Sequence, residues 1–290
     1  MTDVSLVPPR RVAIIGAGLL GGSFGLAVKK YWSAETIIGV SRSAESRDEA
    51  IRSGAVTETT DDIEAACTDA DWVIVSVPVG AISGVVVRAS RVCDPSGLIV
   101  DLGSTKSSIV RAIDDDEIAS SCFVGTHPIA GSEKTGAAHA SADLFVGKPV
   151  VITPGSCTPA KNVDRVEAVW QMLGGSTTRM TPEAHDEVMA VISHVPHLAA
   201  SMMAALLPRE LAPLVGSGWL DTTRVASGDP AMWVSICREN AGPITRQIAI
   251  SIRWMQTLAS AIERNDFEAV RQLLAEAKSI RDAARANVKR

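Results

Sequence analysis

A glycine-rich turn near the N-terminus constrains the fold of this chain more than any other feature. The turn reads GAGLLG, follows the apolar run VAII and precedes a stretch with a helical pattern. Gly16 permits a tight turn, Gly18 lets the backbone approach a pyrophosphate, and Gly21 allows a helix to pack closely on a strand. The sequence therefore predicts a dinucleotide-binding βαβ unit, whose helix N-terminus faces the phosphates. The expected contacts at this turn are Gly16, Gly18, Leu19, Leu20 and Gly21.

Short apolar runs alternate with helical stretches through the first half of the chain. The runs are nearly continuous in apolar residues, as parallel strands covered on both faces require. They predict an α/β fold of the Rossmann type, with a doubly wound parallel sheet. The predicted strands are 11–16, 36–41, 71–78, 97–104 and 122–127, with later strands at 148–154 and 176–180 and a helix at 159–173.

The pattern changes after Met180, since every long segment from Pro182 onward fits a helix. The predicted helices are 182–207, 242–264 and 267–286. Apolar residues recur at steps of three and four on the second of them, so that face needs a surface to pack against. We therefore predict a dinucleotide-binding domain over residues 1–180 and an all-α dimerisation domain over residues 181–290, in a homodimer.

Length, charge and cysteine usage narrow the class of protein. A length of 290 residues suggests about two domains, and a net charge of -5 argues against nucleic acid or an anionic membrane as a partner. The five cysteines include no CxxC pair, so we expect no metal site and a reducing compartment. The first ten residues lack the apolar core of a signal peptide, and histidines and a proline interrupt the apolar run 189–207. We expect a buried helix there and a cytoplasmic protein.

The end of the second predicted strand bears on the choice of cofactor. NAD-binding folds usually place a carboxylate there for the ribose hydroxyls. This chain instead has Ser41, Arg42 and Ser43, whose hydroxyls and guanidinium suit a 2′-phosphate. We therefore predict NADP, with NAD as the alternative, and expect Val77 and Pro78 at a later strand end to complete the cofactor site.

Three segments fall at carboxyl ends of the predicted strands, where open α/β sheets bind their ligands. They are SVP at 76–78, DLGSTK at 101–106 and HP at 127–128. Together with the longer stretch GTHPIAGSEKTG at 125–136, they closely resemble the prephenate/arogenate dehydrogenase family of tyrosine biosynthesis. The resemblance implies that His127 hydrogen-bonds the ring hydroxyl of the substrate. It also implies that Ser104 supports His127 and the nicotinamide.

The chemistry of that family explains why a histidine is needed. Prephenate carries a hydroxyl and a hydrogen on one ring carbon, and the hydrogen leaves as hydride. A base near the hydroxyl helps, and neutral histidine suits this role near pH 7. Loss of carboxylate then makes the ring aromatic and drives the reaction forward.

Two histidines lie three residues apart in the predicted long helix. His194 and His197 therefore share a face, and Pro196 between them predicts a kink. The resemblance implies that this helix lines the substrate pocket.

Further residues match the family beyond this helix. Arg224, in the pattern DTTR, is the residue implied to bind a substrate carboxylate, and a guanidinium can grip a carboxylate with two hydrogen bonds. Trp233 is expected to pack near the pocket. His197 favours the keto group of prephenate, whereas Glu133 favours the ammonium of arogenate, so both substrates stay open with a lean towards prephenate.

Two other classes of protein share parts of this pattern. A hydroxyacid or imine reductase with the same architecture would typically place a lysine at the position of His127. A non-catalytic NADP(H) sensor would keep the glycines but would not need His127, Ser104 and Arg224 together.

Overall fold

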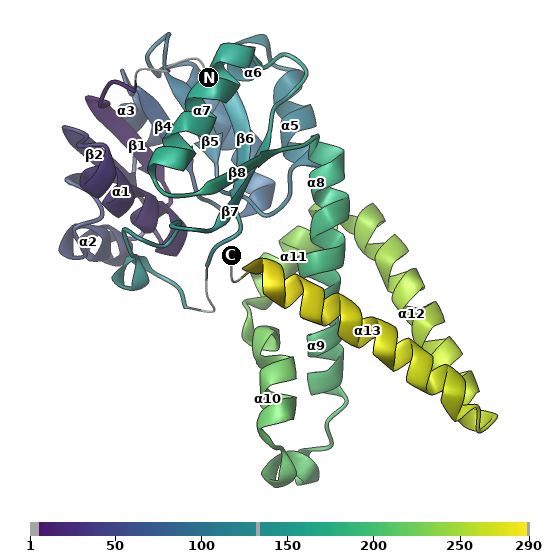
Figure 1. The fold of residues 1–290 in the computed structure, drawn as a ribbon. Helices are drawn as coiled ribbons and strands as arrows, with labels where there is room; N and C mark the ends of the chain where they lie inside the picture. The colour runs from purple at the N-terminus through teal and green to yellow at the C-terminus, as the bar shows by residue number, and fades with distance from the viewer. Residues whose placement is uncertain (1–5, 132–133, 289–290) are drawn as a thin grey trace. The chain divides into compact units, whose positions relative to one another are not determined.

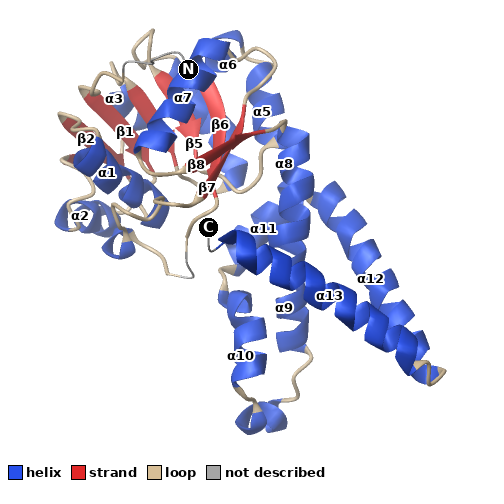
Figure 2. Cartoon of the chain, viewed as in Figure 1, coloured by secondary structure: helices blue, strands red, loops and turns tan. Residues whose placement is uncertain are grey.

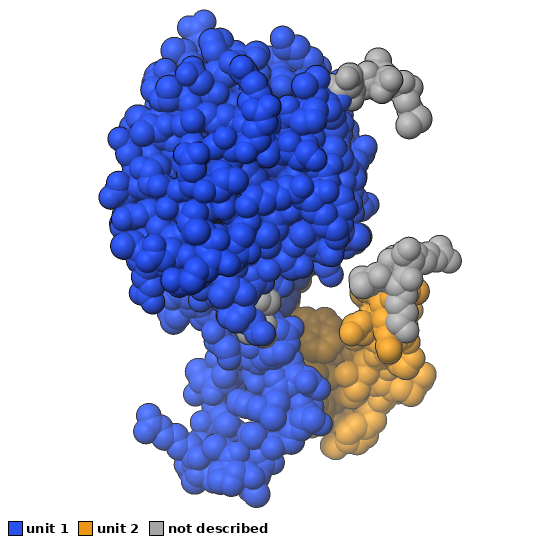
Figure 3. Space-filling view, turned by 90° about the vertical axis from the view of Figure 1, so that its left-hand side faces the viewer, with its two compact units in different colours: residues 1–241 blue, residues 242–290 orange. Residues whose placement is uncertain are grey.

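The computed structural model describes residues 6–131 and 134–288. Internal contacts divide the chain into two compact units, Met1–Ala241 and Gly242–Arg290, which Figure 3 distinguishes by colour. The predicted domain boundary after Met180 follows the change of sequence pattern and stays a prediction.

One sheet of eight strands organises the first part of the larger unit. Its order is β3-β2-β1-β4-β5-β6-β7-β8, and every neighbouring pair is parallel except β6 and β7. Figures 1 and 2 show the sheet with its helices, and only helices and loops after β8. The strands are β1 (Arg11–Ile15), β2 (Thr36–Val40), β3 (Glu58–Thr60), β4 (Trp72–Val75), β5 (Leu98–Asp101), β6 (Phe123–Pro128), β7 (Pro149–Thr153) and β8 (Ser176–Arg179).

Helices connect these strands and cover both faces of the sheet. They are α1 (Leu19–Tyr31), α2 (Ala44–Arg52), α3 (Ile63–Cys67), α4 (Ile82–Ser90), α5 (Ser107–Asp114), α6 (Glu117–Cys122) and α7 (Ala160–Met172). Successive side chains of β1 enter opposite cores: Val12 and Ile14 belong to one, Ala13 and Ile15 to the other. This burial on both faces explains the apolar runs and confirms the predicted doubly wound sheet.

Two features of the sheet differ from the prediction. The prediction missed β3, a three-residue edge strand of polar residues. The sheet was also predicted to be parallel, whereas β7 runs antiparallel to β6, so that His127 pairs with Val151. A strand pattern does not encode direction, and the long connection from β6 to β7 permits either.

The predicted long helix after β8 is interrupted. It consists of α8 (Pro182–Met189), a π-helical turn (Ala190–His194) and α9 (Val195–Ala205). Pro196 has no N–H to donate, and the change of helical spacing lies directly before it. The expected irregularity is therefore present, but it precedes the proline.

The remaining helices complete the two units. They are α10 (Ser217–Thr223) and α11 (Pro230–Glu239) in the larger unit, then α12 (Ala241–Glu263) and α13 (Phe267–Val288). Short 3-10 turns lie at Val79–Ala81, Ala137–His139, Arg209–Leu214 and Arg224–Ser227. The predicted apolar stripe on α12 has exposed members, including Ile252, Met255 and Ile262.

One helical stretch is long and apolar enough to cross a membrane when judged by length and composition. It is Pro182–Ala205, and a third of its most apolar window is buried. The stretch also carries three histidines and Asp186, all buried. Core helices of folded proteins pass the same test, but the helix that was expected to be buried is buried over only part of its surface.

An aromatic cluster joins α1 and α7 on one face of the sheet. The Trp170 ring lies 5.4 Å from Phe24 and 5.2 Å from Phe145 between centroids, with edge-to-face angles of 77° and 83°. Trp170 is fully buried. Such pairs add to the stabilisation that burial itself provides.

We predict that Trp170→Ala lowers the free energy of unfolding by about 3–5 kcal/mol, because it leaves a cavity in this cluster. Urea denaturation at fixed protein concentration measures the change. Ile118→Ala on α6, where the side chain is exposed, serves as the control and should cost about 0.5 kcal/mol or less. Equal losses for the two variants would contradict the assignment of Trp170 to the core.

Candidate active site

The glycine turn lies where β1 and β4 end side by side. Gly16 has φ +94, and a Cβ there would lie 2.2 Å from the carbonyl oxygen of Ser76. A Cβ on Gly21 would lie 2.2 Å from the carbonyl oxygen of Gly16. Gly18 differs, since a Cβ there would meet no atom within 4 Å. Packing therefore requires Gly16 and Gly21, while the space at Gly18 is open to a ligand.

A cavity of about 570 Å³ opens at this turn. Three predicted cofactor residues line it, namely Gly16, Gly18 and Ser41, and α1 begins beside it without a side-chain cap. Open space, uncapped helix N–H groups and a sharp glycine turn fit a pyrophosphate. The remaining lining residues are Ala17, Glu45, Ser46, Glu49, Arg52, Ser76, Thr135 and Gly136. The other predicted contacts are not among the lining residues: Leu19, Leu20, Gly21, Arg42, Ser43, Val77 and Pro78.

The start of α2 brings acids into the same cavity. Ser43 caps this helix by accepting a hydrogen bond from the Ser46 N–H at 3.3 Å, so its hydroxyl already has a partner, and Arg42 is exposed. Glu49 accepts the Ala137 N–H at 3.2 Å, which joins α2 to a later loop. From the sequence, Glu49 lies beyond the strand end and was rejected as a substitute for the missing carboxylate, and Glu45 was not considered. The helix start turns both of them towards the cavity.

His127 lies near the carboxyl end of β6, the edge of the sheet where β1, β4 and β5 also end. Its Nδ1 is 2.8 Å from Nε2 of His185 on α8. Burial lowers the pKa of His127 well below its ordinary value, and the nearby His185, Lys106 and His194 lower it further. The ring is therefore neutral at pH 7, as a base requires.

A buried carboxylate holds this pair of histidines. Asp186 accepts a hydrogen bond from Nδ1 of His185 at 2.8 Å, and the N–H groups of Lys106 and Ser107 donate to it at 2.8 and 2.9 Å. Burial alone would raise the pKa of Asp186, but these hydrogen bonds outweigh it and the pKa lies below its ordinary value. From the sequence, His185 and Asp186 were noted only as a match to the family, with no role assigned.

The loop that follows β5 is also fixed by a buried ion pair. Asp101 and Lys106 are fully buried and hydrogen-bonded to each other. Asp101 further accepts the N–H groups of Gly103 at 2.9 Å and Thr126 at 3.0 Å. Ser104 lies within this loop, and its hydroxyl makes no hydrogen bond with the described residues. Its support of His127 therefore stays a prediction.

His194 is buried beside the same loop. Asn240 contacts its Nδ1 at 3.0 Å and donates to the Asp186 carbonyl at 2.8 Å. Burial lowers the pKa of His194 to about 4. The Ser104 carbonyl is near this ring and favours its protonated form, but within the described residues Nε2 of His194 makes no hydrogen bond. An unpaired buried nitrogen of this kind suits a polar ligand.

The predicted neighbours His197 and Trp233 form a stack. Their ring centroids are 3.4 Å apart at an interplanar angle of 11°, and the His194 and Trp233 rings meet edge to face with centroids 6.1 Å apart. A Cβ on Gly228 would lie 2.6 Å from Nε1 of Trp233 and 3.1 Å from Cε1 of His197, so the stack requires glycine there. The structure thus brings three predicted substrate residues together.

The other two predicted substrate residues are placed differently. Arg224 opens the 3-10 turn Arg224–Ser227, which contacts α9, and its side chain is exposed. Glu133 lies outside the described residues. The roles of both stay predictions.

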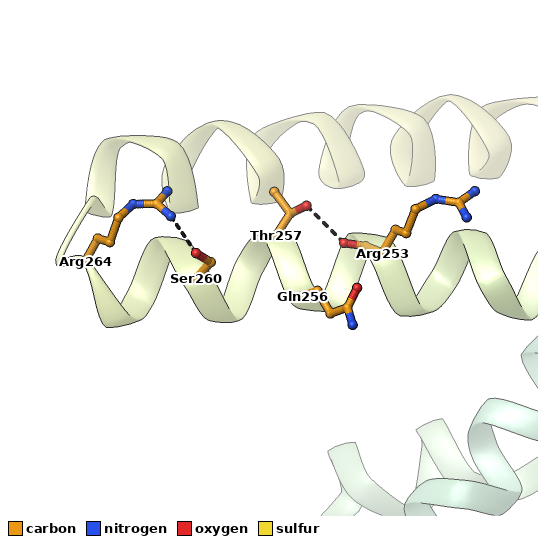
Figure 4. Close-up of a pocket in the computed structure, with 5 residues that line it drawn as sticks. All are labelled: Arg253, Gln256, Thr257, Ser260 and Arg264. Atoms are coloured by element: carbon orange, nitrogen blue, oxygen red, sulfur yellow. Dashed lines mark hydrogen bonds between the residues drawn. The ribbon is translucent and has the colours of Figure 1, made fainter.

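A second hollow, of about 410 Å³, lies along α12 in the smaller unit. Figure 4 shows its lining residues, Arg253, Gln256, Thr257, Ser260 and Arg264. Arg264 donates to Ser260, and Thr257 donates to the Arg253 carbonyl at 2.9 Å. No predicted site residue is among these five, so we take the glycine cavity as the candidate ligand site.

Comparison with known proteins agrees with this arrangement. The family models described as "Prephenate dehydrogenase, nucleotide-binding domain" and "Prephenate dehydrogenase, dimerization domain" match residues 24–179 and 181–276. The cyclohexadienyl dehydrogenase of Zymomonas mobilis is 32% identical over 264 residues, which cover 89% of this chain and 90% of the relative. The prephenate dehydrogenase of Bacillus subtilis is 33% identical over 278 residues, covering 93% and 75%.

Solved structures give the same result. Prephenate dehydrogenase from A. aeolicus, in complex with hydroxyphenyl propionate and NAD+, superposes with a TM-score of 0.88 at 31% identity. The match covers 98% of this chain and all of that one. Arogenate dehydrogenase from Synechocystis superposes with a TM-score of 0.77 at 25% identity and covers 94% and 99%. The chain belongs to the prephenate dehydrogenase family.

Proposed function

We propose that the chain catalyses the oxidative decarboxylation of prephenate, or of arogenate, in tyrosine biosynthesis, with hydride transfer to NAD(P). The observation that carries the proposal is His127, partly buried and hydrogen-bonded to His185, at the edge of the sheet where the glycine cavity opens. Ligands of open α/β sheets bind at this edge. The family membership supplies the reaction class.

The reaction divides between the cofactor and the protein. When bound, the nicotinamide would accept the hydride. His127 takes the proton of the ring hydroxyl as the hydride leaves the carbon that bears it, and carbon dioxide leaves as the ring becomes aromatic. General-base help of this kind contributes about 10²–10⁴-fold.

Binding of the substrate is assigned to the residues around α9. Arg224 would pair with a carboxylate of the substrate, and Ser104 would support His127 and the nicotinamide. The stacked His197 and Trp233 would hold the side chain of the substrate. His197 favours the keto group of prephenate, and that preference is part of the proposal.

NADP is the proposed cofactor because no carboxylate lies at the end of β2. Ser41 and Ser46 offer hydroxyls in the cavity, and Arg52 offers positive charge. Glu45 and Glu49 line the same cavity and would favour NAD, whose ribose hydroxyls can donate to a carboxylate. We further propose a homodimer, because apolar residues of α12 are exposed. A cytoplasmic location is proposed because all five cysteines are free.

Reduction of NADP and of NAD, each with prephenate and with arogenate, tests the function directly. We expect turnover in at least one of the four combinations. Bound NADP without turnover in any of them would favour a reductase of hydroxyacid or imine type or a non-catalytic sensor.

We predict that His127→Asn lowers kcat about 10²–10⁴-fold, because the variant has no base for the hydroxyl proton. Cofactor affinity, measured by isothermal titration, should stay within about twofold since His127 is not a cavity residue. A variant with normal kcat would contradict the role of His127.

Arg224→Ala should raise KM about tenfold or more, because a hydrogen bond to a charged group contributes about 1.5–3 kcal/mol. Steady-state kinetics measures the effect. Arg111→Ala removes an exposed arginine from α5 and serves as the control, with KM unchanged. An unchanged KM for Arg224→Ala would exclude it as the carboxylate partner.

Ser41→Asp should lower the ratio of kcat/KM for NADP over NAD about tenfold or more, since like charges brought together cost several kcal/mol. Ser41→Ala removes the hydroxyl without adding charge and should change the ratio far less. An unaltered ratio in Ser41→Asp would show that a 2′-phosphate does not bind beside this residue.

A further inference from the structure

Asp186 is an acceptor whose role is fixed by the backbone. The N–H groups of Lys106 and Ser107 both donate to its carboxylate, at 2.8 and 2.9 Å. A backbone N–H can only donate, so a proton on this carboxyl group would compete with a donor already in place. Asp186 is therefore ionised and can only accept.

This fixed acceptor determines which nitrogen of His185 carries hydrogen. Nδ1 of His185 is 2.8 Å from Oδ1 of Asp186, so Nδ1 must be the N–H nitrogen. Burial keeps the His185 ring neutral, because it lowers the pKa more than Asp186 raises it. A neutral imidazole has one N–H, so Nε2 of His185 bears a lone pair.

The same reasoning extends to His127. Its Nδ1 lies 2.8 Å from Nε2 of His185. Because that Nε2 bears a lone pair, Nδ1 of His127 donates the hydrogen bond. We propose that Asp186 and His185 are positioning residues that fix the tautomer of His127, leaving Nε2 of His127 as the nitrogen that accepts the substrate proton. The identity of that proton rests on the proposed function, whereas the tautomer follows from the three side chains alone.

The charges around the three side chains are consistent with this direction of hydrogen bonding from His127 to Asp186. Lys106 and Asp101 form a buried ion pair at the start of α5, and His194 lies on the adjoining π-helical turn. Lys106 and His194 disfavour a charged His127 in the resting site. Once His127 has accepted a proton, the carboxylate of Asp186 stabilises the positive charge through His185. A carboxylate supports the histidine of a Ser-His-Asp triad in the same way.

Asp186→Asn tests the direction of the hydrogen bonds from His127 through His185 to residue 186, with little change in the shape of the side chain. When the amide oxygen accepts the Ser107 N–H, the NH₂ takes the position of Oδ1, loses the Lys106 hydrogen bond and donates to Nδ1 of His185. His185 then carries its hydrogen on Nε2 and donates to His127, whose lone pair moves away from Nε2. We expect kcat to fall about 10²-fold or more with KM changed less than about threefold; the equivalent change in a serine protease costs about 10⁴-fold in kcat.

Matched variants separate positioning from folding. Asp114 is also a hydrogen-bonded carboxylate, with Ser156 as its partner at 2.8 Å, and Asp114→Asn should leave kcat unchanged. His185→Gln keeps an acceptor for His127 and a donor for Asp186, so it should retain at least about ten times the kcat of His185→Leu. Equal kcat values for His185→Gln and His185→Leu would overturn the proposal, and this comparison remains available if Asp186→Asn does not fold.

The tautomer itself is measured by ¹⁵N NMR of the histidine-labelled protein at pH 7, without substrate. The chain has five histidines, so assignment by single substitution is feasible. We expect an N–H shift at Nδ1 and a lone-pair shift at Nε2 for His127, exchanged in Asp186→Asn. A lone pair at Nδ1 of His127 in the unsubstituted protein would overturn the inference. Absence of turnover with the predicted tautomer in place would instead contradict the proposed function alone.

Discussion

The carboxylate of Asp186 at the start of α5 is the interaction on which the candidate site depends. Helix α5 has Lys106 at its N-cap position and no capping side chain of its own. Asp186, 80 residues further along the chain, accepts two of the free N–H groups instead. Negative charge at a helix N-terminus is stabilised by the helix dipole as well as by these hydrogen bonds. The side chain of Asp186 thus caps α5, links α8 to α5 and orients the adjacent His185.

The opposing effects of burial and charge explain how His127 can be a base. Burial and the nearby Lys106 keep the ring unprotonated at neutral pH, which frees it to accept a proton. The same burial would make that proton costly to hold. Asp186 offsets this cost through His185, because its negative charge is near when His127 becomes positive. In the proposed reaction His127 is therefore a neutral base at rest, and Asp186 would stabilise its charged form as the proton arrives.

The sequence was most informative where local patterns determine structure. The glycine turn, the apolar strands and the change to helices after β8 are periodic or steric signals, and the fold follows them. The edge strand β3 escaped prediction because its three polar residues lack any burial pattern. The reversed direction of β7 and the π-helical turn before Val195 depend on contacts between distant segments, which periodicity does not report.

Some residues of the candidate site could likewise be predicted from local sequence patterns, and others could not. His127 and Ser104 were predicted from the resemblance of motifs at strand ends, and His194 and His197 from the resemblance of the long helix and their shared face on it. His185 is 58 residues from His127, and only the folded chain brings their rings within hydrogen-bond distance. Glu45 was missed and Glu49 was rejected because only the turn into α2 directs them to the cavity. Arg224 was chosen by its motif, and its exposed position gives no further support.

A crystal structure with NADP and 4-hydroxyphenylpyruvate bound would show whether His127 meets the substrate hydroxyl. We expect the phenolic oxygen within hydrogen-bond distance of Nε2 of His127, while Nδ1 of the same ring stays paired with His185. A phenolic oxygen bound elsewhere, with Nε2 of His127 facing only protein atoms, would contradict the assignment of His127 as the base.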